Sequence, residues 1–211
     1  MSDPQELRLF EECGALVRGS HLVYTSGRHG SEYVNKDALY PRTEVISALC
    51  AKMADAFVRD GVEAVFAPAL GGIVLTQWTA HHLQAKTGKP VLALFAEKAE
   101  TPEGFVVKRG YDALLRGKRT LVVEDILTTG GSIKKIVQLS AKMDIPVVGV
   151  AALCNRGGIS AADLGVPRLV SIVEVSLQSW EAADCPLCKQ GVPVNTKLGK
   201  GGSTQAPSAI R

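Results

Sequence analysis

The chain lacks long apolar runs and a strong charge of either sign, and these absences exclude several classes of protein. Its longest apolar runs, such as VVGVAALC from Val147, fall far short of the roughly 20 residues that a membrane-spanning helix needs. The 24 basic and 21 acidic residues leave a formal charge of +3, which is too small to indicate a nucleic-acid or membrane surface. We therefore expect a soluble protein whose partners must be inferred from individual sites.

We also expect neither a secretory signal nor a disulfide framework. The first residues, MSDPQELRLFEECG, carry acids where a signal peptide carries bases, so we expect a cytoplasmic location. Cys13, Cys50 and Cys154 stand singly among apolar neighbours, which is typical of reduced, buried thiols. Cys185 and Cys188 form one CPLC, which is half of a zinc site, a redox pair or simply two thiols. Because no second CxxC exists, a zinc site would need ligands from a partner subunit.

Length and composition predict one domain with a tail. A chain of 211 residues that is 46% hydrophobic can bury a real core. Beyond Asp184 the composition turns to Cys, Pro, Gly, Lys and Ser, and GKGGSTQAPSAIR has almost nothing to bury. We expect one domain over residues 1–184, and a Cys-pair segment with a flexible tail over residues 185–211.

The apolar pattern predicts alternating helices and strands. Apolar residues at helical spacing predict a helix over Thr43–Gly61 and another over Ile73–Thr87, with the strand and loop AVFAPALGG between them. Further along come the strand VLALF, a polar segment over Glu97–Lys118, the strand TLVVED, a helix over Ser132–Met143 and the strand VVGVAALC. Unalternated apolar strands separated by helices predict an α/β fold, with an open, mainly parallel sheet covered on both faces by helices.

One stretch, LVVEDILTTGGS over residues 121–132, carries the strongest functional signal. Glu124 and Asp125 end an apolar strand, where ligands of parallel sheets bind. The glycines and hydroxyls that follow lead directly into a helix, so backbone N–H groups can cradle an anion such as phosphate. For TTGGS alone, a merely capped turn is an equal alternative. The two acids favour a ligand with a phosphate at one end and hydroxyls at the other, as in ribose 5-phosphate.

This stretch resembles the phosphoribosyl diphosphate signature of type I phosphoribosyltransferases. The resemblance implies that fold, with a small hood formed by about residues 1–40 and 156–184. It implies that Glu124 and Asp125 contact the ribose hydroxyls. The 5-phosphate would be held by Thr128, Thr129, Gly130, Gly131 and Ser132.

Two other segments extend the resemblance. APALGGI resembles the family's pyrophosphate loop, and the residues implied in diphosphate binding are Ala69, Leu70, Gly71 and Gly72. Lys98 matches the lysine that opens the family's long flexible loop, and with Asp125 and Glu124 it completes the expected catalytic set. In isolation these features would be an ordinary loop and a solvated charge.

The region Ala15–Leu39, which contains SGR, is similar to the opening of orotate phosphoribosyltransferases. Ser26 and Arg28 of that motif are therefore candidates for base binding. Arg156, in ALCNRGG, matches an arginine that binds the acidic pyrimidine in those enzymes, and a planar guanidinium suits a planar anion. The alternative for Arg156 is a surface arginine at a strand end.

The chain departs from the orotate pattern in its charges. Thr25 stands where a basic residue usually precedes SGR. In the flexible loop, the places of an arginine, a lysine and a histidine are taken by Glu97, Thr101 and Glu103. Losing these positive charges should slow the reaction unless Lys108 or Arg109 substitutes for them.

The resemblance implies transfer of a phosphoribosyl group from phosphoribosyl diphosphate to orotate, with Mg²⁺ as cofactor and a homodimer as the assembly. Mg²⁺ would be held mainly through the diphosphate, with Asp125 as the one side chain considered for direct ligation. Two alternatives stay open. One is a phosphoribosyltransferase for another base, and the other is a non-catalytic regulator that binds phosphoribosyl diphosphate or a nucleotide.

Overall fold

The computed structural model describes residues 4–24, 26–100 and 104–198, which group into two compact units. The first unit comprises Met1–Glu6 and Leu39–Val175, and the second comprises Leu7–Ala38 and Ser176–Arg211. The second unit is therefore built from two segments that lie far apart in the sequence.

A six-stranded sheet in the order β10-β9-β8-β5-β6-β7 forms the centre of the first unit. Its strands are β5 (Ala64–Pro68), β6 (Leu92–Lys98), β7 (Phe105–Val106), β8 (Thr120–Leu127), β9 (Val147–Asn155) and β10 (Leu169–Glu174). Neighbouring strands run parallel except β7, which pairs antiparallel with the end of β6. Every residue of β5 is buried, as expected for a strand covered on both faces. The predicted α/β fold with an open, mainly parallel sheet is confirmed.

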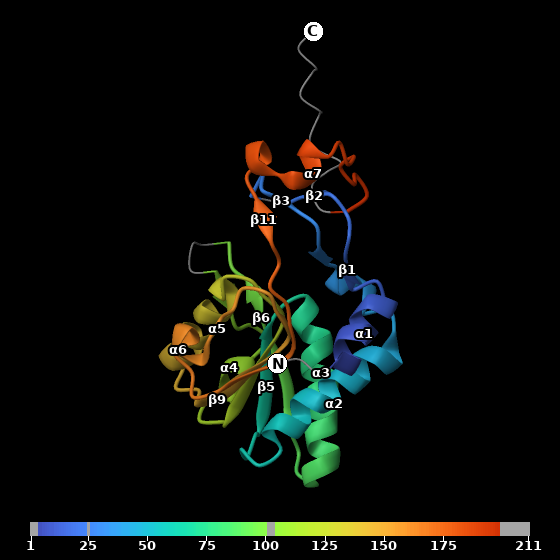
Figure 1. Cartoon of the computed structure of the whole chain (residues 1–211). Coiled ribbons are helices and arrows are strands. Elements are labelled where there is room, and N and C mark those ends of the chain that lie inside the picture. Colours follow the sequence, from blue (N-terminus) through green and yellow to red (C-terminus); the bar gives the residue numbers. More distant parts are fainter. Residues whose placement is uncertain (1–3, 25, 101–103, 199–211) are drawn as a thin grey trace. The chain divides into compact units, whose positions relative to one another are not determined.

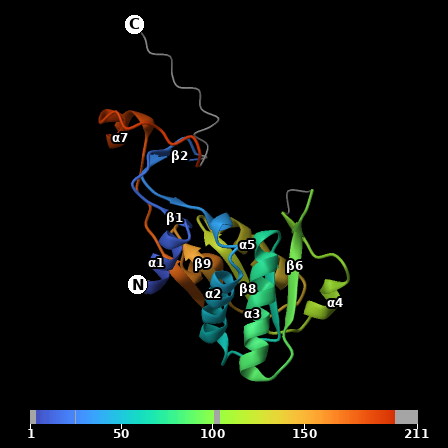
Figure 2. The ribbon, with the colours of Figure 1, turned by 90° about the vertical axis from the view of Figure 1, so that its right-hand side faces the viewer.

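Helices cover both faces of this sheet (Figures 1 and 2). They are α2 (Thr43–Phe57), α3 (Gly71–Thr87), α4 (Tyr111–Leu115), α5 (Gly131–Lys142) and α6 (Ala161–Leu164). Helices α2 and α3 pack against each other, and α3 contacts β5, β6 and β8. On the other face, Leu115 of α4 and Ile133 of α5 join Phe66 and Val122 in one buried apolar cluster. This core fixes the carboxyl ends of β5 and β8 next to each other.

The predicted helices of the first unit are present, with shifted ends. Helix α2 ends at Phe57, and Gly61 lies beyond it with φ 62°. Helices α3 and α5 begin at Gly71 and Gly131, slightly earlier than periodicity predicted. The polar segment between β6 and β8 also contains the short strand β7 and helix α4. Gly71 and Gly72 therefore lie in the first turn of α3, and Gly131 lies in the first turn of α5.

The second unit has two small antiparallel sheets. Strand β1 (Leu16–Val17) pairs with β4 (Tyr33–Val34), and the other sheet has the order β11-β3-β2, from β11 (Ser179–Trp180), β3 (His29–Gly30) and β2 (Leu22–Val23). The short helices are η1 (Lys36–Ala38), η2 (Ala182–Asp184) and α7 (Pro186–Lys189), and α1 (Pro4–Glu12) crosses the boundary between the units along the chain. The hood expected over 1–40 and 156–184 stays a prediction, and its residues 156–175 belong to the first unit. The predicted tail begins with the described residues 185–198, whereas 199–211 lie outside the described residues.

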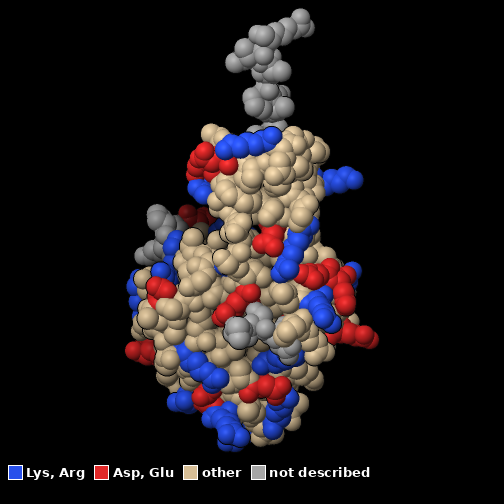
Figure 3. Space-filling view, in the orientation of Figure 1, with Lys and Arg blue, Asp and Glu red and all other residues tan. Residues whose placement is uncertain are grey.

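The surface matches the nearly balanced charge of the sequence. Figure 3 shows acidic and basic side chains interspersed over the face in view. Among the described residues, none of the helices combines the length and hydropathy required to cross a bilayer.

Candidate active site

Two almost fully buried carboxylates lie near the carboxyl end of β8, which continues through Ile126 and Leu127 instead of ending at the acids as predicted. Glu124 is 8% exposed and Asp125 is 7% exposed. The Asp125 carboxylate accepts hydrogen bonds from the Tyr40 hydroxyl at 2.8 Å and from the backbone N–H of Ile126 at 2.7 Å. The Glu124 carboxylate accepts one from the backbone N–H of Asp125 at 3.1 Å. Since a buried carboxylate needs such partners, these bonds orient both acids at the carboxyl edge of the sheet.

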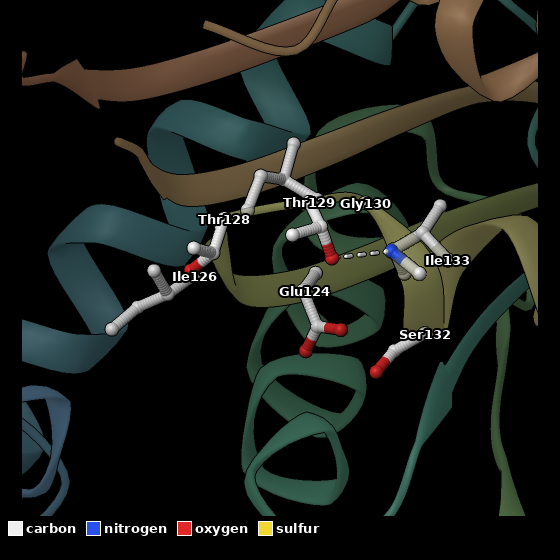
Figure 4. Close-up of a pocket in the computed structure, with 9 residues that line it drawn as sticks. Glu124, Ile126, Thr128, Thr129, Gly130, Ser132 and Ile133 are labelled. Carbon is white, nitrogen blue, oxygen red and sulfur yellow. Dashed lines mark hydrogen bonds between the residues drawn. The ribbon is translucent and has the colours of Figure 1, made fainter. Parts of the chain in front are cut away.

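Residues 128–132 connect β8 to α5 and are called the cradle below. Gly130 has φ 70°, and a Cβ at this position would lie 2.9 Å from a methyl group of Leu164, so glycine is required there. The N–H of Gly131 donates to Thr129 Oγ1 at 3.4 Å. Together with Glu124, the cradle lines a cavity of about 150 Å³ (Figure 4). Because the first N–H groups of a helix lack intrahelical partners, the start of α5 offers this cavity donors for an anion.

A second glycine loop joins β5 to α3 at the same edge of the sheet. It contains Ala69, Leu70, Gly71 and Gly72, and the peptide bond between Ala69 and Leu70 is cis. A Cβ on Gly71 would lie 2.4 Å from a carboxylate oxygen of Asp125 and 2.4 Å from the Tyr40 hydroxyl. The backbone of this loop therefore lies directly against the buried acids. Leu70 is 82% exposed and makes no contribution to the core.

Arg156 follows β9 and contacts the cradle. Its Nε donates a hydrogen bond to Thr128 Oγ1 at 2.8 Å. The backbone N–H groups of Arg156 and Gly157 both donate to the carbonyl of Leu127. A Cβ on Gly157 would lie 1.7 Å from the Thr128 carbonyl oxygen, so the two loops pack backbone against backbone. Arg156 thus has one donor, Nε, fixed on the cradle.

The segment after β6 is rich in paired charges. Lys98 is exposed at the end of β6. Its neighbour Glu97 forms ion pairs with Arg109 and with Lys108, the latter at 3.3 Å. The Arg109 guanidinium, followed by Lys108, lowers the pKa of Glu97. The two bases that were candidates to replace the missing loop charges are therefore engaged by Glu97. Thr101 and Glu103 lie outside the described residues, as does Thr25.

Ser26 and Arg28 lie in the second unit, in the hairpin between β2 and β3. The Arg28 guanidinium donates to the side chain of Ser179 at 3.0 Å and to its carbonyl at 2.8 Å. It also forms an ion pair with Glu181. Ser26 Oγ accepts a hydrogen bond from the Arg28 backbone N–H at 3.4 Å. Arg28 therefore ties the hairpin to β11, and its role in base binding stays a prediction.

Two histidines lie beside the cysteine pair in the second unit. The ligand atoms of His21, His29, Cys185 and Cys188 all lie within 4.8 Å of one another. The sequence-based statement that only a partner subunit could supply further ligands is therefore wrong, because the same chain brings two histidines to the pair. Nothing in the spacing of His21 and His29 could have indicated this, since more than 150 residues separate them from the cysteines.

Comparison with known proteins identifies the family. A family model described as the phosphoribosyl transferase domain matches residues 9–181. The chain belongs to this family. The resemblance to type I phosphoribosyltransferases that LVVEDILTTGGS carries is thereby confirmed, and the protein is an enzyme of this class.

The chain is similar to curated proteins named orotate phosphoribosyltransferase. It is 33% identical to the orotate phosphoribosyltransferase of Chlorobium phaeobacteroides, over 92% of this chain and 95% of that one. It is 34% identical to that of Thermotoga maritima, over 92% and 97% of the two chains. Among solved structures, the orotate phosphoribosyltransferase of Aeropyrum pernix matches with a TM-score of 0.61 and 27% identity, over 79% of this chain and 92% of that one.

A further solved relative shows the shared fold at lower identity. The Mycobacterium tuberculosis orotate phosphoribosyltransferase in complex with 5-phospho-alpha-D-ribosyl 1-diphosphate has a TM-score of 0.56 and 20% identity, over 82% of this chain and 91% of that one. At this identity the likeness supports the α/β architecture of the phosphoribosyltransferase and leaves residue roles to the geometry of the site.

Proposed function

We propose that this phosphoribosyltransferase transfers the phosphoribosyl group of phosphoribosyl diphosphate to orotate, giving orotidine 5'-monophosphate and diphosphate in pyrimidine biosynthesis. One observation carries the proposal. Two nearly buried carboxylates near the carboxyl end of β8 lie two residues before an anion cradle, and one of them, Asp125, lies directly against a second glycine loop. A homodimer belongs to the same proposal and follows from the resemblance alone, whereas a cytoplasmic location is proposed from the acidic first residues of the sequence.

The cradle and the two acids suit the two ends of a ribose 5-phosphate. Cradle N–H groups, the hydroxyls of Thr129 and Ser132 and the start of α5 would hold the phosphate. Asp125 and Glu124 would accept hydrogen bonds from the ribose hydroxyls. Their negative charge would also stabilise the positive charge that develops on the sugar ring as diphosphate leaves, as in glycoside cleavage.

The second loop is the candidate for diphosphate binding. Gly71 lies against Asp125, so a group bound by the N–H groups of Ala69–Gly72 would lie next to the ribose site. Mg²⁺ fits this donor set, because it prefers carboxylate and phosphate oxygens and keeps several waters. Within residues 4–24, 26–100 and 104–198, no cluster of three or more acidic side chains forms an all-protein cage for it. Asp125 would be the side chain to hold the ion, which when bound would supply positive charge against the departing diphosphate.

Base recognition is assigned to Arg156, Ser26 and Arg28. Arg156 keeps its Nη donors beyond the Nε contact with Thr128, and two parallel N–H groups suit the carboxylate of orotate. Lys98, at the end of β6, is the candidate for contacting diphosphate. The loop after it includes residues 101–103, which lie outside the described residues.

A second function is favoured by the charges around Glu97. Because Glu97 pairs with Lys108 and Arg109, the loop after β6 offers less positive charge to a leaving diphosphate. A chain that binds phosphoribosyl diphosphate without turnover would act as a regulator. Turnover with orotate, turnover with another base, and tight binding without turnover separate the three possibilities.

The test is a diphosphate-release assay with purified protein, Mg²⁺, phosphoribosyl diphosphate and a panel of bases. Release with orotate is expected, and Asp125→Asn should lower kcat/KM at least about ten-fold, on the order of 1.4 kcal/mol. Asp144→Asn, which changes an exposed acid paired with Arg116, is the matched control. Unchanged kcat/KM in Asp125→Asn would remove the acids from the site.

The role of Arg156 is tested with two variants, because its side chain also forms a hydrogen bond with the cradle. Arg156→Lys should raise the KM for orotate about ten-fold to a hundred-fold, since it loses a paired charge-assisted contact. Thr128→Val removes the partner of Nε together with one hydroxyl of the cradle, so its effect on the KM for orotate, compared with that on the KM for phosphoribosyl diphosphate, reports the supporting role. If both variants changed the KM values for orotate and phosphoribosyl diphosphate alike, Arg156 would be a positioning residue and the choice of orotate would lose its main support.

A further inference from the structure

Four metal-binding side chains of the second unit converge on one point. His21 directly precedes β2, and His29 lies on β3. Cys185 directly precedes α7, and Cys188 lies within it. Figure 1 shows α7 beside β2 and β3. Their ligand atoms lie within 4.8 Å of one another. None of these residues belongs to the site proposed above.

Hydrogen bonds alone do not account for this arrangement. His21 Nδ1 lies 2.6 Å from the carbonyl oxygen of Val192, which can only accept, so Nδ1 carries the proton. In the neutral ring, Nε2 then has one lone pair. Three groups nevertheless approach Nε2: His29 Nδ1 at 2.9 Å, Cys185 Sγ at 3.6 Å and Cys188 Sγ at 3.6 Å. One lone pair cannot accept from three donors, whereas a cation at their centre uses every one of these atoms.

We propose that His21, His29, Cys185 and Cys188 bind a structural Zn²⁺ ion. A tetrahedral site with Zn–S near 2.3 Å and Zn–N near 2.05 Å requires ligand separations of about 3.6 Å between S and N and about 3.3 Å between N and N. The separations between S and N are 3.6, 3.6 and 3.3 Å, and the two nitrogens are 2.9 Å apart. Two thiolates and two imidazoles are also the ligands that Zn²⁺ prefers.

The surroundings of His21 favour metal binding through Nε2. Its bond to the Val192 carbonyl selects the tautomer with a free lone pair on Nε2, as second-sphere partners of zinc-bound histidines commonly do. The chain after α7 then runs back along this residue. Asn195 N–H donates to the His21 carbonyl at 2.7 Å, and its side chain donates to Ser20 at 3.0 Å. Residues between 185 and 195 therefore contact both ring nitrogens and the backbone of His21.

The second unit also has little else to hold its C-terminal segment. Between Ser176 and Leu198, Cys185 is the one residue with a buried side chain. The strands of this unit are two residues long, so sheet hydrogen bonds add little. Small units of this kind commonly depend on a metal or disulfides. With four protein ligands and no open position, the site is structural rather than catalytic.

The proposal is tested by measuring zinc in the full-length chain, expressed without a polyhistidine tag and purified without chelators. About one zinc per chain is expected by mass spectrometry of the metal. Replacement by Co²⁺ should give the absorption bands of a tetrahedral site with thiolate-to-metal charge transfer.

Variants locate the ion. Cys188→Ser and His29→Ala should each weaken Zn²⁺ affinity at least about ten-fold, measured by competition with a coloured chelator. Cys13→Ala, which removes a buried thiol of the same unit outside the cluster, should keep the zinc. Circular dichroism would show that the helices of the first unit remain folded in the variants.

Three results would overturn the proposal. They are a wild-type chain that takes up neither zinc nor cobalt, a Cys188→Ser variant that holds zinc as tightly as Cys13→Ala, and a Cys185–Cys188 disulfide in freshly isolated, zinc-free protein. The last result would make the pair a redox site. Each readout is independent of phosphoribosyl transfer, so the outcome does not depend on the proposed function.

Discussion

The two units of this phosphoribosyltransferase are stabilised by different means. The first has strands of up to nine residues and a continuous apolar core that includes Phe66, Val122 and Ile133. The second has strands of two residues, and its short C-terminal segment is held by polar contacts from Arg28 and by the cysteine–histidine cluster. Residues that must stay fixed during catalysis, such as Asp125, therefore lie on the unit with the larger core.

The contrast has a physical basis in burial. Apolar burial contributes roughly 25 cal/mol for each Å² removed from water, so the described segment 176–198, in which Cys185 is the one buried side chain, gains little from it. The binding of a metal ion by a few side chains can replace that contribution, but loss of any one of these side chains then removes much of the stabilisation. The first unit should tolerate loss of one polar contact, whereas the second should respond sharply to the loss of one ligand.

Cysteine reactivity gives the largest expected difference between the units. Burial raises the pKa of the Cys50 thiol to about 12, and that of Cys154 likewise to about 12. At about pH 8 such thiols are thiolates in roughly one molecule in ten thousand, so an alkylating reagent should leave both unmodified. Burial and the neighbouring Cys185 also raise the pKa of Cys188, but its side chain is exposed, so it should be labelled faster than either buried thiol once a chelator has removed zinc, and slowly before. Peptide mass spectrometry measures each site, and labelling of Cys50 at the rate of Cys188 would contradict the contrast.

Core truncation should have the next largest effect. Phe66 is fully buried in β5, and Phe66→Ala should lower the free energy of unfolding by about 3–5 kcal/mol, measured by urea denaturation. Phe105→Ala, on the half-buried strand β7, is the matched control and should cost clearly less. Similar losses in the two variants would mean that β7 belongs to the core as much as β5 does.

Zinc removal should loosen the second unit while leaving the first intact. Trypsin cleavage after the exposed Lys189 should become at least about ten-fold faster when a chelator is added, because α7 would lose two of its anchors. Cleavage after Lys142, at the end of α5, should not change. In Cys188→Ser, cleavage after Lys189 should be fast without chelator and unaffected by it. A chelator effect of equal size at both lysines would mean that the ion stabilises the whole chain.

Loss of the ion pairs of Glu97 should have the smallest effect on the free energy of unfolding. The Arg109 guanidinium and Lys108 lower the pKa of Glu97 in the folded chain. The contribution to stability is therefore present above the unfolded pKa and is lost as pH falls through the folded pKa. Glu97→Gln should be slightly less stable than wild type at about pH 7, and the difference should vanish at strongly acid pH and shrink at high salt. A difference that grows on acidification would reverse the sign of this linkage.

Local features were predicted well from the sequence. The strand that carries Glu124 and Asp125, the turn after it and the helix that follows were predicted, because each depends on a few consecutive residues; the end of the strand was placed two residues too early. Apolar runs, glycines at positive φ and hydroxyls before a helix act over one or two turns of chain. The order of helices and strands could be predicted for the same reason, since each element is specified by its own local pattern.

Contacts between distant residues were decided by the tertiary structure alone. Tyr40 donates to Asp125 across 85 positions, Arg156 reaches Thr128 across 28, and Lys108 and Arg109 turn to Glu97. The cysteine pair, half of a site in the sequence, meets its two histidines only because both chain segments fold into one unit. Periodicity reports which face of an element is buried, and it carries no information on which distant element covers that face.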